Sequence, residues 1–212
     1  MRISFVLLCE GSSDEPLVDI LSRQLVAHGA TEANGYADSR KKTRDHPATV
    51  TGRLRRLLDE HTCVDLVFVH RDADSDDPEE RLREINAAVL GIPDLPLCVP
   101  VVPVQETEAW LLLDEQEIRR VAGNPRGRMD LHLPSPEHIE REPHPKERLQ
   151  QALLDASGAS GRRREQERKR FNEHRRILLQ RLRTDGPVTQ VPSWQRLEQD
   201  IDQVIRKRNW AI

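Results

Sequence analysis

Three pairs of acidic residues each follow an apolar segment of the length expected for a buried strand. The pairs are Glu10 with Asp14, Asp72 with Asp74, and Glu106 with Glu108. Carboxylates that are held close together repel one another unless a cation neutralises them. Oxygen ligands of this kind favour Mg²⁺, Mn²⁺ or Ca²⁺ over zinc. Because a divalent cation polarises phosphate and activates the attacking oxygen, these acids indicate phosphoryl chemistry.

The apolar segments before these acids are predicted to be parallel strands. They are Ile3–Cys9, Val64–His70 and Leu97–Val104. Helical patterns lie between them, as in βαβ units with right-handed crossovers. Parallel order brings the carboxyl ends of the strands to one edge, where the functional groups of open α/β sheets lie. The sequence therefore predicts a compact, Rossmann-like α/β domain with a mostly parallel sheet flanked by helices.

The predicted domain organisation has three parts. Residues 1–122 form the α/β core, in which the polar segment Gly29–Pro47 is expected to be a basic loop. Residues 123–160 begin with a stretch rich in Pro, Gly and His and are expected to form a loop or lid. Residues 161–212 are expected to be C-terminal helices packed on the core, starting with a basic helix over residues 162–183.

Composition limits the function classes. With 33 Lys and Arg against 36 Asp and Glu, the net charge of -3 gives no overall attraction to nucleic acid or anionic membranes. No stretch approaches the ~20 apolar residues needed to cross a bilayer, so we expect no membrane association. The three cysteines, Cys9, Cys63 and Cys98, lie far apart, and we interpret them as buried thiols in a cytoplasmic protein.

Two segments resemble the TOPRIM domain shared by topoisomerases, primases and OLD-type nucleases. Ile3–Asp14 is an apolar strand that ends in Glu-Gly-x-Ser-Asp, and Val67–Asp74 is one that ends in Asp-x-Asp. Val102–Leu112, with its Glu-x-Glu-Ala-Trp motif, and the pair Pro145-Lys146 resemble the small stand-alone TOPRIM-like proteins of the DUF4276 family. The resemblance covers roughly the first 150 residues and implies a TOPRIM-type fold.

The resemblance also implies site residues, a cofactor and partners. The implied metal ligands for Mg²⁺ or Mn²⁺ are Glu10, Asp72 and Asp74, with Asp14 and an acid of the Glu106/Glu108 pair at a second ion in the OLD-like branch. Asp14 stands where the family usually has Glu. The implied catalytic residues are Glu10, Asp72, Asp74 and Lys146, of which Lys146 stabilises the transition-state phosphate. Family context implies a role in phage defence or mobile-element biology beside an ATPase partner. The chain has no Gly-x4-Gly-Lys-[Ser/Thr] loop, so any ATP hydrolysis is expected to belong to that partner.

Basic residues in two segments, together with one beside the acids, form the predicted nucleic-acid surface. They are Arg40, Lys41, Lys42, Arg44, Arg71, Lys169 and Arg170. Such side chains neutralise the phosphates of DNA or RNA. Aromatic residues make up only 3% of the chain. Few side chains can therefore stack on bases, and we expect weak sequence preference.

Three functions are compatible with these patterns. The first is a Mg²⁺- or Mn²⁺-dependent nuclease, in which Asp72→Ala abolishes cleavage. The second is a non-catalytic module that binds metal and either nucleic acid or a partner, without turnover. The third takes Asp72-Ala73-Asp74-Ser75 as the start of a haloacid-dehalogenase-type phosphatase with Asp72 as nucleophile, which trapping of BeF₃⁻ at Asp72 would support.

Overall fold

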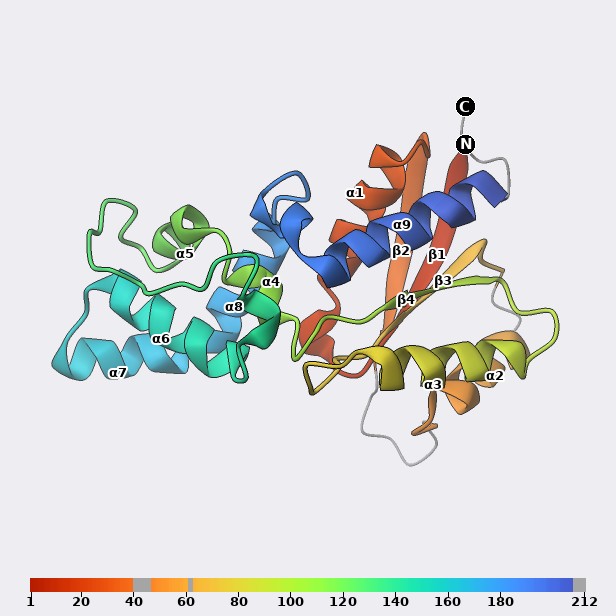
Figure 1. Ribbon diagram of the computed structural model, residues 1–212, viewed down its shortest axis with the longest axis horizontal. Helices are drawn as coiled ribbons and strands as arrows, with labels where there is room; N and C mark the ends of the chain where they lie inside the picture. The colour runs from red at the N-terminus through yellow and green to blue at the C-terminus, as the bar shows by residue number, and fades with distance from the viewer. Residues whose placement is uncertain (40–46, 61–62, 208–212) are drawn as a thin grey trace. The chain divides into compact units, whose positions relative to one another are not determined.

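A computed structural model describes residues 1–39, 47–60 and 63–207 (Figure 1). The chain divides into two compact units. Unit 1 contains Met1–Ala73, Asp77–Val102 and the chain from Gln195 on, and unit 2 contains Asp74–Asp76 and Pro103–Trp194. The predicted boundaries after residues 122 and 160 differ from this division. The segment expected to be a loop or lid contributes a long helix to unit 2, and most of the last helix belongs to unit 1.

Unit 1 is built on a sheet of parallel strands in the order β2-β1-β3-β4. The strands are β1 (Arg2–Cys9), β2 (Glu32–Ser39), β3 (Leu66–His70) and β4 (Leu97–Val101). The two central strands, β1 and β3, are mostly buried, which explains why their sequences are almost continuously apolar. The predicted Rossmann-like α/β fold with a parallel sheet is confirmed.

The edge strand β2 corrects one prediction. Gly29–Pro47 was expected to be a polar loop, yet Glu32–Ser39 pairs with β1 over its whole length. This edge strand is half-exposed and carries mostly polar residues, so hydrophobic periodicity gives no signal for it. Gly35 makes room for the Phe5 ring, since a Cβ at this position would lie 2.2 Å from Phe5 Cζ.

Helices cover both faces of this sheet. On one face, α2 (Val50–Asp59) and α3 (Glu79–Leu90) pack on alternate residues of the central strands, such as Val6 and Val67. The opposite face is covered by α1 (Leu17–Ala27) and α9 (Pro192–Lys207), as Figure 1 shows. A hydrogen bond from Gln24 Nε2 to Glu198 Oε1, at 3.4 Å, joins these two helices. Short connections lead from the carboxyl ends of β1 and β3 to the helices that follow.

Unit 2 is helical among the described residues. Its helices are α4 (Glu108–Leu111), α5 (Glu115–Val121), α6 (Pro145–Ser157), α7 (Gly161–Lys169) and α8 (Phe171–Arg181), with short 3₁₀ helices at Ile139–Arg141 and Pro187–Gln190. The single basic helix predicted over residues 162–183 is divided at Arg170, whose ψ of 6° departs from helical geometry. In the core, Trp110 and Trp194 meet edge to face at 5.0 Å, and Trp110 Nε1 donates to Ser193 Oγ at 3.0 Å.

The three cysteines differ in their exposure to solvent. Cys9 is buried and Cys98 is partly buried, but Cys63 is exposed, so the prediction of three buried thiols is wrong at Cys63. Within the described ranges, no helix combines the length and the apolar character needed to cross a membrane.

Candidate functional site

The carboxyl edge of the unit 1 sheet carries the first group of predicted site residues. Glu10 follows β1, and Asp72 follows β3 two residues after its end. Because β1 and β3 are parallel neighbours, with Leu8 opposite Val69, their two following segments leave the same edge. The structure thus places Glu10 and Asp72 at the edge that the sequence predicts for them.

Glu10 lies next to a cation of its own chain. Its side chain is 49% exposed, and its Oε1 lies 2.9 Å from Arg71 Nε. The same guanidinium donates from Nη1 to Glu84 Oε1 on α3 at 3.0 Å. Arg71 was predicted to contact nucleic acid, and that role stays a prediction. In the structure, its mostly buried side chain lies between two carboxylates.

The carboxylate of Asp72 contacts the side chain of a buried histidine. His70, the last residue of β3, is 1% exposed, and its Nε2 lies 3.5 Å from Asp72 Oδ1. The side chain of Asp72 is 27% exposed, so its carboxylate is both anchored and open to solvent. An acid in this position combines a fixed orientation with access for a ligand.

Asp14 lies deeper than the other acids of unit 1. It belongs to a 3₁₀ turn at Ser12–Asp14, is 5% exposed, and accepts a hydrogen bond from Ser13 Oγ at 3.3 Å. Burial raises the pKa of the Cys9 thiol to about 12, and the negative charge of Asp14 adds to this rise. The structure therefore surrounds Asp14 with protein, and its predicted metal contact stays a prediction.

Unit 2 brings the other predicted residues together. Asp74, Glu106 and Lys146 come from three separate segments and line one cavity of about 320 Å³, together with Gln105, His144 and Glu147. The Lys146 backbone N–H, in the first turn of α6, donates to Glu106 Oε2 at 3.3 Å. A carboxylate at this end of a helix is favoured by the helix dipole. Three acids, Asp74, Glu106 and Glu147, thus share one solvent-open cavity with Lys146.

The backbone of this cavity is strained at two positions. Asp74 has a φ of 55° and Gln105 has a φ of 60°, and neither residue is glycine. Asp74 N–H donates to the Gln105 carbonyl at 2.9 Å, and Gln105 N–H donates to the Ser75 carbonyl at 2.9 Å. Left-handed backbone costs about 1–3 kcal/mol and persists where surrounding contacts enforce it, often at functional sites. These two hydrogen bonds are such contacts.

The electrostatics of the cavity centre on Glu106. Burial raises the pKa of Glu106, and the carboxylates of Glu108 and Asp74 raise it further. Lys146 opposes the rise through its backbone hydrogen bond and its charge. A carboxylate whose ionised form is disfavoured in this way gains stability when a cation binds beside it.

Glu108, the partner of Glu106 in the predicted pair, has a different environment. Its Oε1 accepts a hydrogen bond from Arg175 Nε at 2.7 Å, and the two side chains are only 5% and 7% exposed. It does not line the cavity that contains Glu106. Of the two acids, the structure places Glu106 at the cavity and pairs Glu108 with α8.

The donor set determines which metal fits. Within residues 1–39, 47–60 and 63–207, no group of three or more His, Cys, Asp or Glu side chains is arranged to hold a metal ion. Asp74 and Glu106, together with Glu147, bring carboxylates to one cavity. Mg²⁺ is commonly held by one or two carboxylates, with waters and substrate phosphate oxygens as its other ligands. The cavity of unit 2 therefore fits Mg²⁺ or Mn²⁺ chemically.

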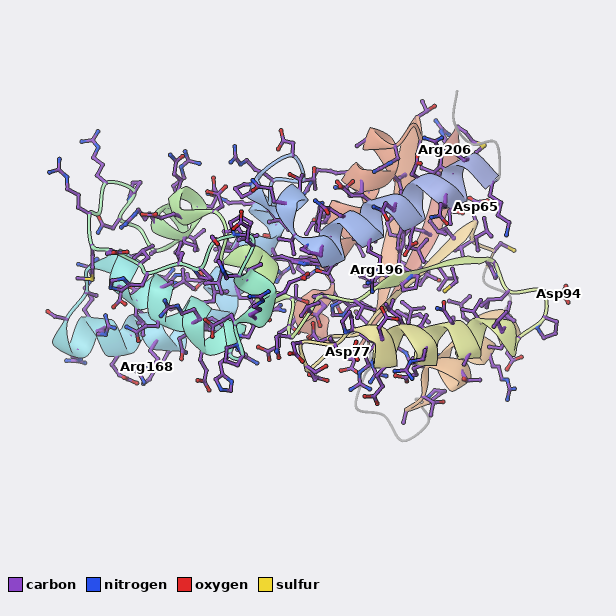
Figure 2. All side chains as sticks on the ribbon, viewed as in Figure 1. Asp65, Asp77, Asp94, Arg168, Arg196 and Arg206 are labelled. Carbon is purple, nitrogen blue, oxygen red and sulfur yellow. The ribbon has the colours of Figure 1, made fainter. Side chains whose placement is uncertain are left out.

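The predicted nucleic-acid residues fall into two sets. Arg40, Lys41, Lys42 and Arg44 lie outside the described residues. Lys169 and Arg170 lie at the end of α7, a helix with no buried residue, whose Arg168 is labelled in Figure 2. Arg170 pairs with Glu173 at 3.1 Å, a contact that raises the pKa of its guanidinium. α7 thus presents its basic side chains to solvent.

Sequence reasoning missed three cavity residues. Gln105, His144 and Glu147 line the cavity beside Asp74 and Glu106. Each lies within two residues of a predicted site residue, so adjacency in the sequence was an available signal. The positive φ of Gln105 had no such signal, because glutamine is not a residue type that favours left-handed backbone.

Most of the chain matches the model of a known protein family. The model of a family described as a domain of unknown function, DUF4276, matches residues 9–202. No curated protein and no solved structure matches the chain.

Proposed function

The chain belongs to the DUF4276 family, and we propose that it is a Mg²⁺- or Mn²⁺-dependent enzyme that cleaves phosphodiester bonds. We also propose the relationship to the TOPRIM domain, on the strength of the strand-end motifs Glu-Gly-x-Ser-Asp and Asp-x-Asp. The parallel sheet that positions these motifs supports the proposal.

One observation carries the proposal: Asp74, Glu106 and Lys146 line the same cavity of unit 2. These residues are far apart in the sequence, and the fold brings them together around a strained backbone. Metal-dependent phosphodiester cleavage uses acids to hold a cation and a positive group to stabilise the developing phosphate charge. The cavity offers both kinds of group within one polar space.

The roles of the residues follow from their chemistry. A bound divalent cation would polarise the scissile phosphate and lower the pKa of a water molecule. Asp74 and Glu106 would hold this cation, and the Lys146 ammonium would stabilise negative charge on the phosphate oxygens. In unit 1, Glu10 and Asp72 would bind divalent cation at the sheet edge, with His70 fixing the orientation of Asp72.

Nucleic acid is the substrate class that we propose. The exposed basic helix α7, with Lys169 and Arg170 at its end, supports it. A role in phage defence beside an ATPase partner belongs to the same proposal and has its basis in the family resemblance alone.

The test is cleavage of DNA and RNA oligonucleotides with Mn²⁺ or Mg²⁺, combined with calorimetric titration of the metal. Asp74→Asn and Lys146→Met should each reduce cleavage by at least about 100-fold. Asn tolerates the left-handed backbone of residue 74, so the fold should be kept. The control is Asp130→Asn, because Asp130 is an exposed acid of the same unit whose side chain is 75% exposed. Equal cleavage by wild type and Asp74→Asn would disprove the proposed role.

A non-catalytic module is the second candidate. The observation that favours it is the exposed basic helix α7, whose side chains can bind nucleic acid or an acidic partner without any cleavage. This function predicts binding of metal and oligonucleotide without turnover under every metal tried. Cleavage that is lost in Lys146→Met but survives in Asp130→Asn would exclude it.

A further inference from the structure

We propose that the outer edge of β2 is a docking site for an extended segment of a protein partner, which joins the sheet as a further strand. The segment that fits this edge has two neighbouring basic residues with apolar residues on either side. All residues of the docking site belong to unit 1, whereas the cavity of the proposed cleavage belongs to unit 2. The inference is therefore independent of the proposed function.

β2 is an open edge of the sheet. It contains eight residues, Glu32–Ser39, and among the described residues it pairs with β1 alone. The backbone N–H and C=O groups on the other side of an edge strand are available to a further strand. The opposite edge is less suitable, because β4 has only five residues and includes Pro100, which has no N–H to donate.

A cavity of about 670 Å³ opens at this edge. It is lined by Tyr36, Ala37, Asp38 and Ser39 of β2, by Val6 of β1, by Val18 of α1 with Glu15 just before that helix, and by Arg56, Leu57 and Glu60 of α2 and its end. Because α1 and α2 cover opposite faces of the sheet, the cavity extends over both sides of the strand edge. A strand laid along β2 would therefore contact residues from both helices.

The two sides of the edge carry the same kinds of side chain. Glu15 and Val18 provide an acid and an apolar group on the α1 side, and Glu60 and Leu57 provide them on the α2 side. Successive side chains of a strand point to opposite faces of the sheet. Of two adjacent basic residues in an added strand, one would thus face Glu15 and the other Glu60. Apolar residues beside them would face Val18 and Leu57.

The charges of the cavity favour a basic occupant. Asp38 is compensated from within the protein, because Arg56 Nη2 and Arg53 Nη2 lie 2.8 and 4.0 Å from its Oδ2. Glu60 lies 3.4 Å from the Nε of the same Arg56, and its side chain is 59% exposed. The exposed Glu15 accepts a hydrogen bond from the neutral Ser39 hydroxyl at 2.6 Å. Glu15 and Glu60 therefore offer negative charge to a partner.

The same charges argue against two other occupants. In a second copy of the chain, β2 contributes Glu32 and Asp38 but no lysine or arginine. Pairing two β2 strands would add acids to an edge that already carries acids, and like charges placed opposite each other destabilise a sheet. Nucleic acid is disfavoured as well, because its phosphates need cations rather than carboxylates.

The test is fluorescence anisotropy of a labelled, capped hexapeptide with two central arginines and two valines on each side. It is titrated with the full chain at about 0.15 M salt, where long-range effects of exposed charges are screened. Glu15→Gln and Glu60→Gln should each weaken binding about threefold, and the double variant by about the product of the two effects. The matched control is Glu80→Gln on α3, an exposed acid outside the cavity, which should bind like wild type.

Methylated peptides distinguish strand addition from simple attraction of charges. Alternate N–H groups of a strand point to the same side, so only one set can donate to β2. Two versions of the hexapeptide carry N-methyl groups at the odd or at the even positions. One version should lose binding by about tenfold or more, and the other should bind like the parent peptide. Equal binding by the two versions would overturn strand addition.

Hydrogen exchange locates the bound peptide. The parent peptide should slow amide exchange in residues 32–39 and leave β4 unchanged. Slow exchange of every β2 amide in the free protein would show that the edge is already covered, and protection of β2 by an oligonucleotide would assign it to nucleic acid. Either result overturns the inference, as does peptide binding that the Glu15→Gln/Glu60→Gln variant leaves unchanged. None of these results bears on cleavage, which is assigned to Asp74, Glu106 and Lys146.

Discussion

The carboxylate of Glu108 accepts a hydrogen bond from Arg175 Nε at 2.7 Å, and both side chains are almost completely buried in unit 2. The pair joins α4 to α8 near the Trp110–Trp194 contact. This relationship explains why the Glu-x-Glu-Ala-Trp segment contains two acids of different character. Glu106 lines a cavity, whereas Glu108 neutralises a buried arginine.

Breaking this pair should destabilise the protein strongly. Glu108→Gln removes the carboxylate charge that lies 2.7 Å from Arg175 Nε, and the loss of one charge from a buried ion pair typically costs about 3–5 kcal/mol. Urea unfolding followed by tryptophan fluorescence measures the loss, because Trp110 and Trp194 are buried in the same unit. The double variant Glu108→Leu/Arg175→Met removes both charges and should recover most of the stability. Failure of the double variant to improve on Glu108→Gln would contradict the ion-pair explanation.

Gly35 on the edge strand should be intolerant of any side chain. A Cβ at this position would lie 2.2 Å from Phe5 Cζ, and the Phe5 ring is itself buried and packed against Phe68. Gly35→Ala should therefore lower the free energy of unfolding by about 1–3 kcal/mol, as overpacked cores do. Gly11→Ala is the control, since its nearest contact would be Ser13 Oγ at 3.4 Å and its φ is extended. If both variants unfold at the wild-type urea concentration, Gly35 does not have this role.

Thiol reactivity should distinguish the three cysteines. Burial raises the pKa of both the Cys9 and the Cys98 thiols to about 12, and Cys63 is exposed. Because the thiolate is the reacting form, a disulfide reagent should modify one thiol quickly in the native protein and all three only after unfolding. Cys63→Ser should remove the fast phase. A fast phase that persists in Cys63→Ser would show that another thiol is accessible.

The parts of the fold that were predictable are those where burial alone determines the sequence. The central strands β1 and β3 are apolar because helices cover both of their faces, and the predicted segments match them to within two residues. β4 lies at an edge of the sheet but was also predicted, because its residues are apolar. β2 was missed because its half-exposed residues are mostly polar, and because its Gly35 is required by the Phe5 ring, a contact across strands. The pattern of residues within one strand carries no information about a contact with a neighbouring strand.

The candidate site likewise has some features that the sequence predicts and others that it does not. The spacing of Asp72 and Asp74 predicts two neighbouring acids, and the chain does place them two residues apart, but in different compact units. The meeting of Glu106 with Lys146 depends on α6 and the residues before it, forty positions along the chain. Only the family resemblance pointed to Lys146, because no property of the Pro145-Lys146 pair itself predicts a distant partner.

Acid should destabilise unit 2 through His174. This residue of α8 is 2% exposed, with Glu167 Oε2 at 3.8 Å from its Nε2. Burial lowers the pKa of His174 below its usual value of 6.5, and the Arg170 charge lowers it further, although Glu167 and Glu173 oppose this. The unfolded chain therefore takes up the proton more readily than the folded one. The stability contribution is complete above the unfolded pKa and is lost as the pH falls below it.

The measurement is the free energy of unfolding in urea between about pH 7 and about pH 5, the range in which an ordinary histidine titrates. Wild type should lose stability across this range, and His174→Leu should show a flatter dependence. His138→Gln, a change at an exposed histidine, should keep the wild-type slope. A wild-type slope in His174→Leu would assign the pH dependence to other groups.

Relief of backbone strain at Gln105 should separate stability from function. Its φ of 60° is enforced by hydrogen bonds with the backbone of Asp74 and Ser75. Gln105→Asn places a residue that tolerates left-handed backbone at this position and keeps an amide beside the cavity. It should raise the free energy of unfolding by about 0.5–1 kcal/mol. Gln105→Gly should also relieve the strain, but it removes the side chain that lines the cavity.

If the strain serves to fix the cavity, the two variants should differ in Mn²⁺-dependent cleavage. Gln105→Asn should retain most of the activity, because the backbone hydrogen bonds and the amide remain. Gln105→Gly should lose activity by about tenfold or more, because a flexible residue no longer holds Asp74 and Glu106 at a fixed separation. Urea unfolding and cleavage are measured on the same preparations. A loss of stability in both variants would show that residue 105 is not strained, and equal activity in both would show that its side chain does not matter to the site.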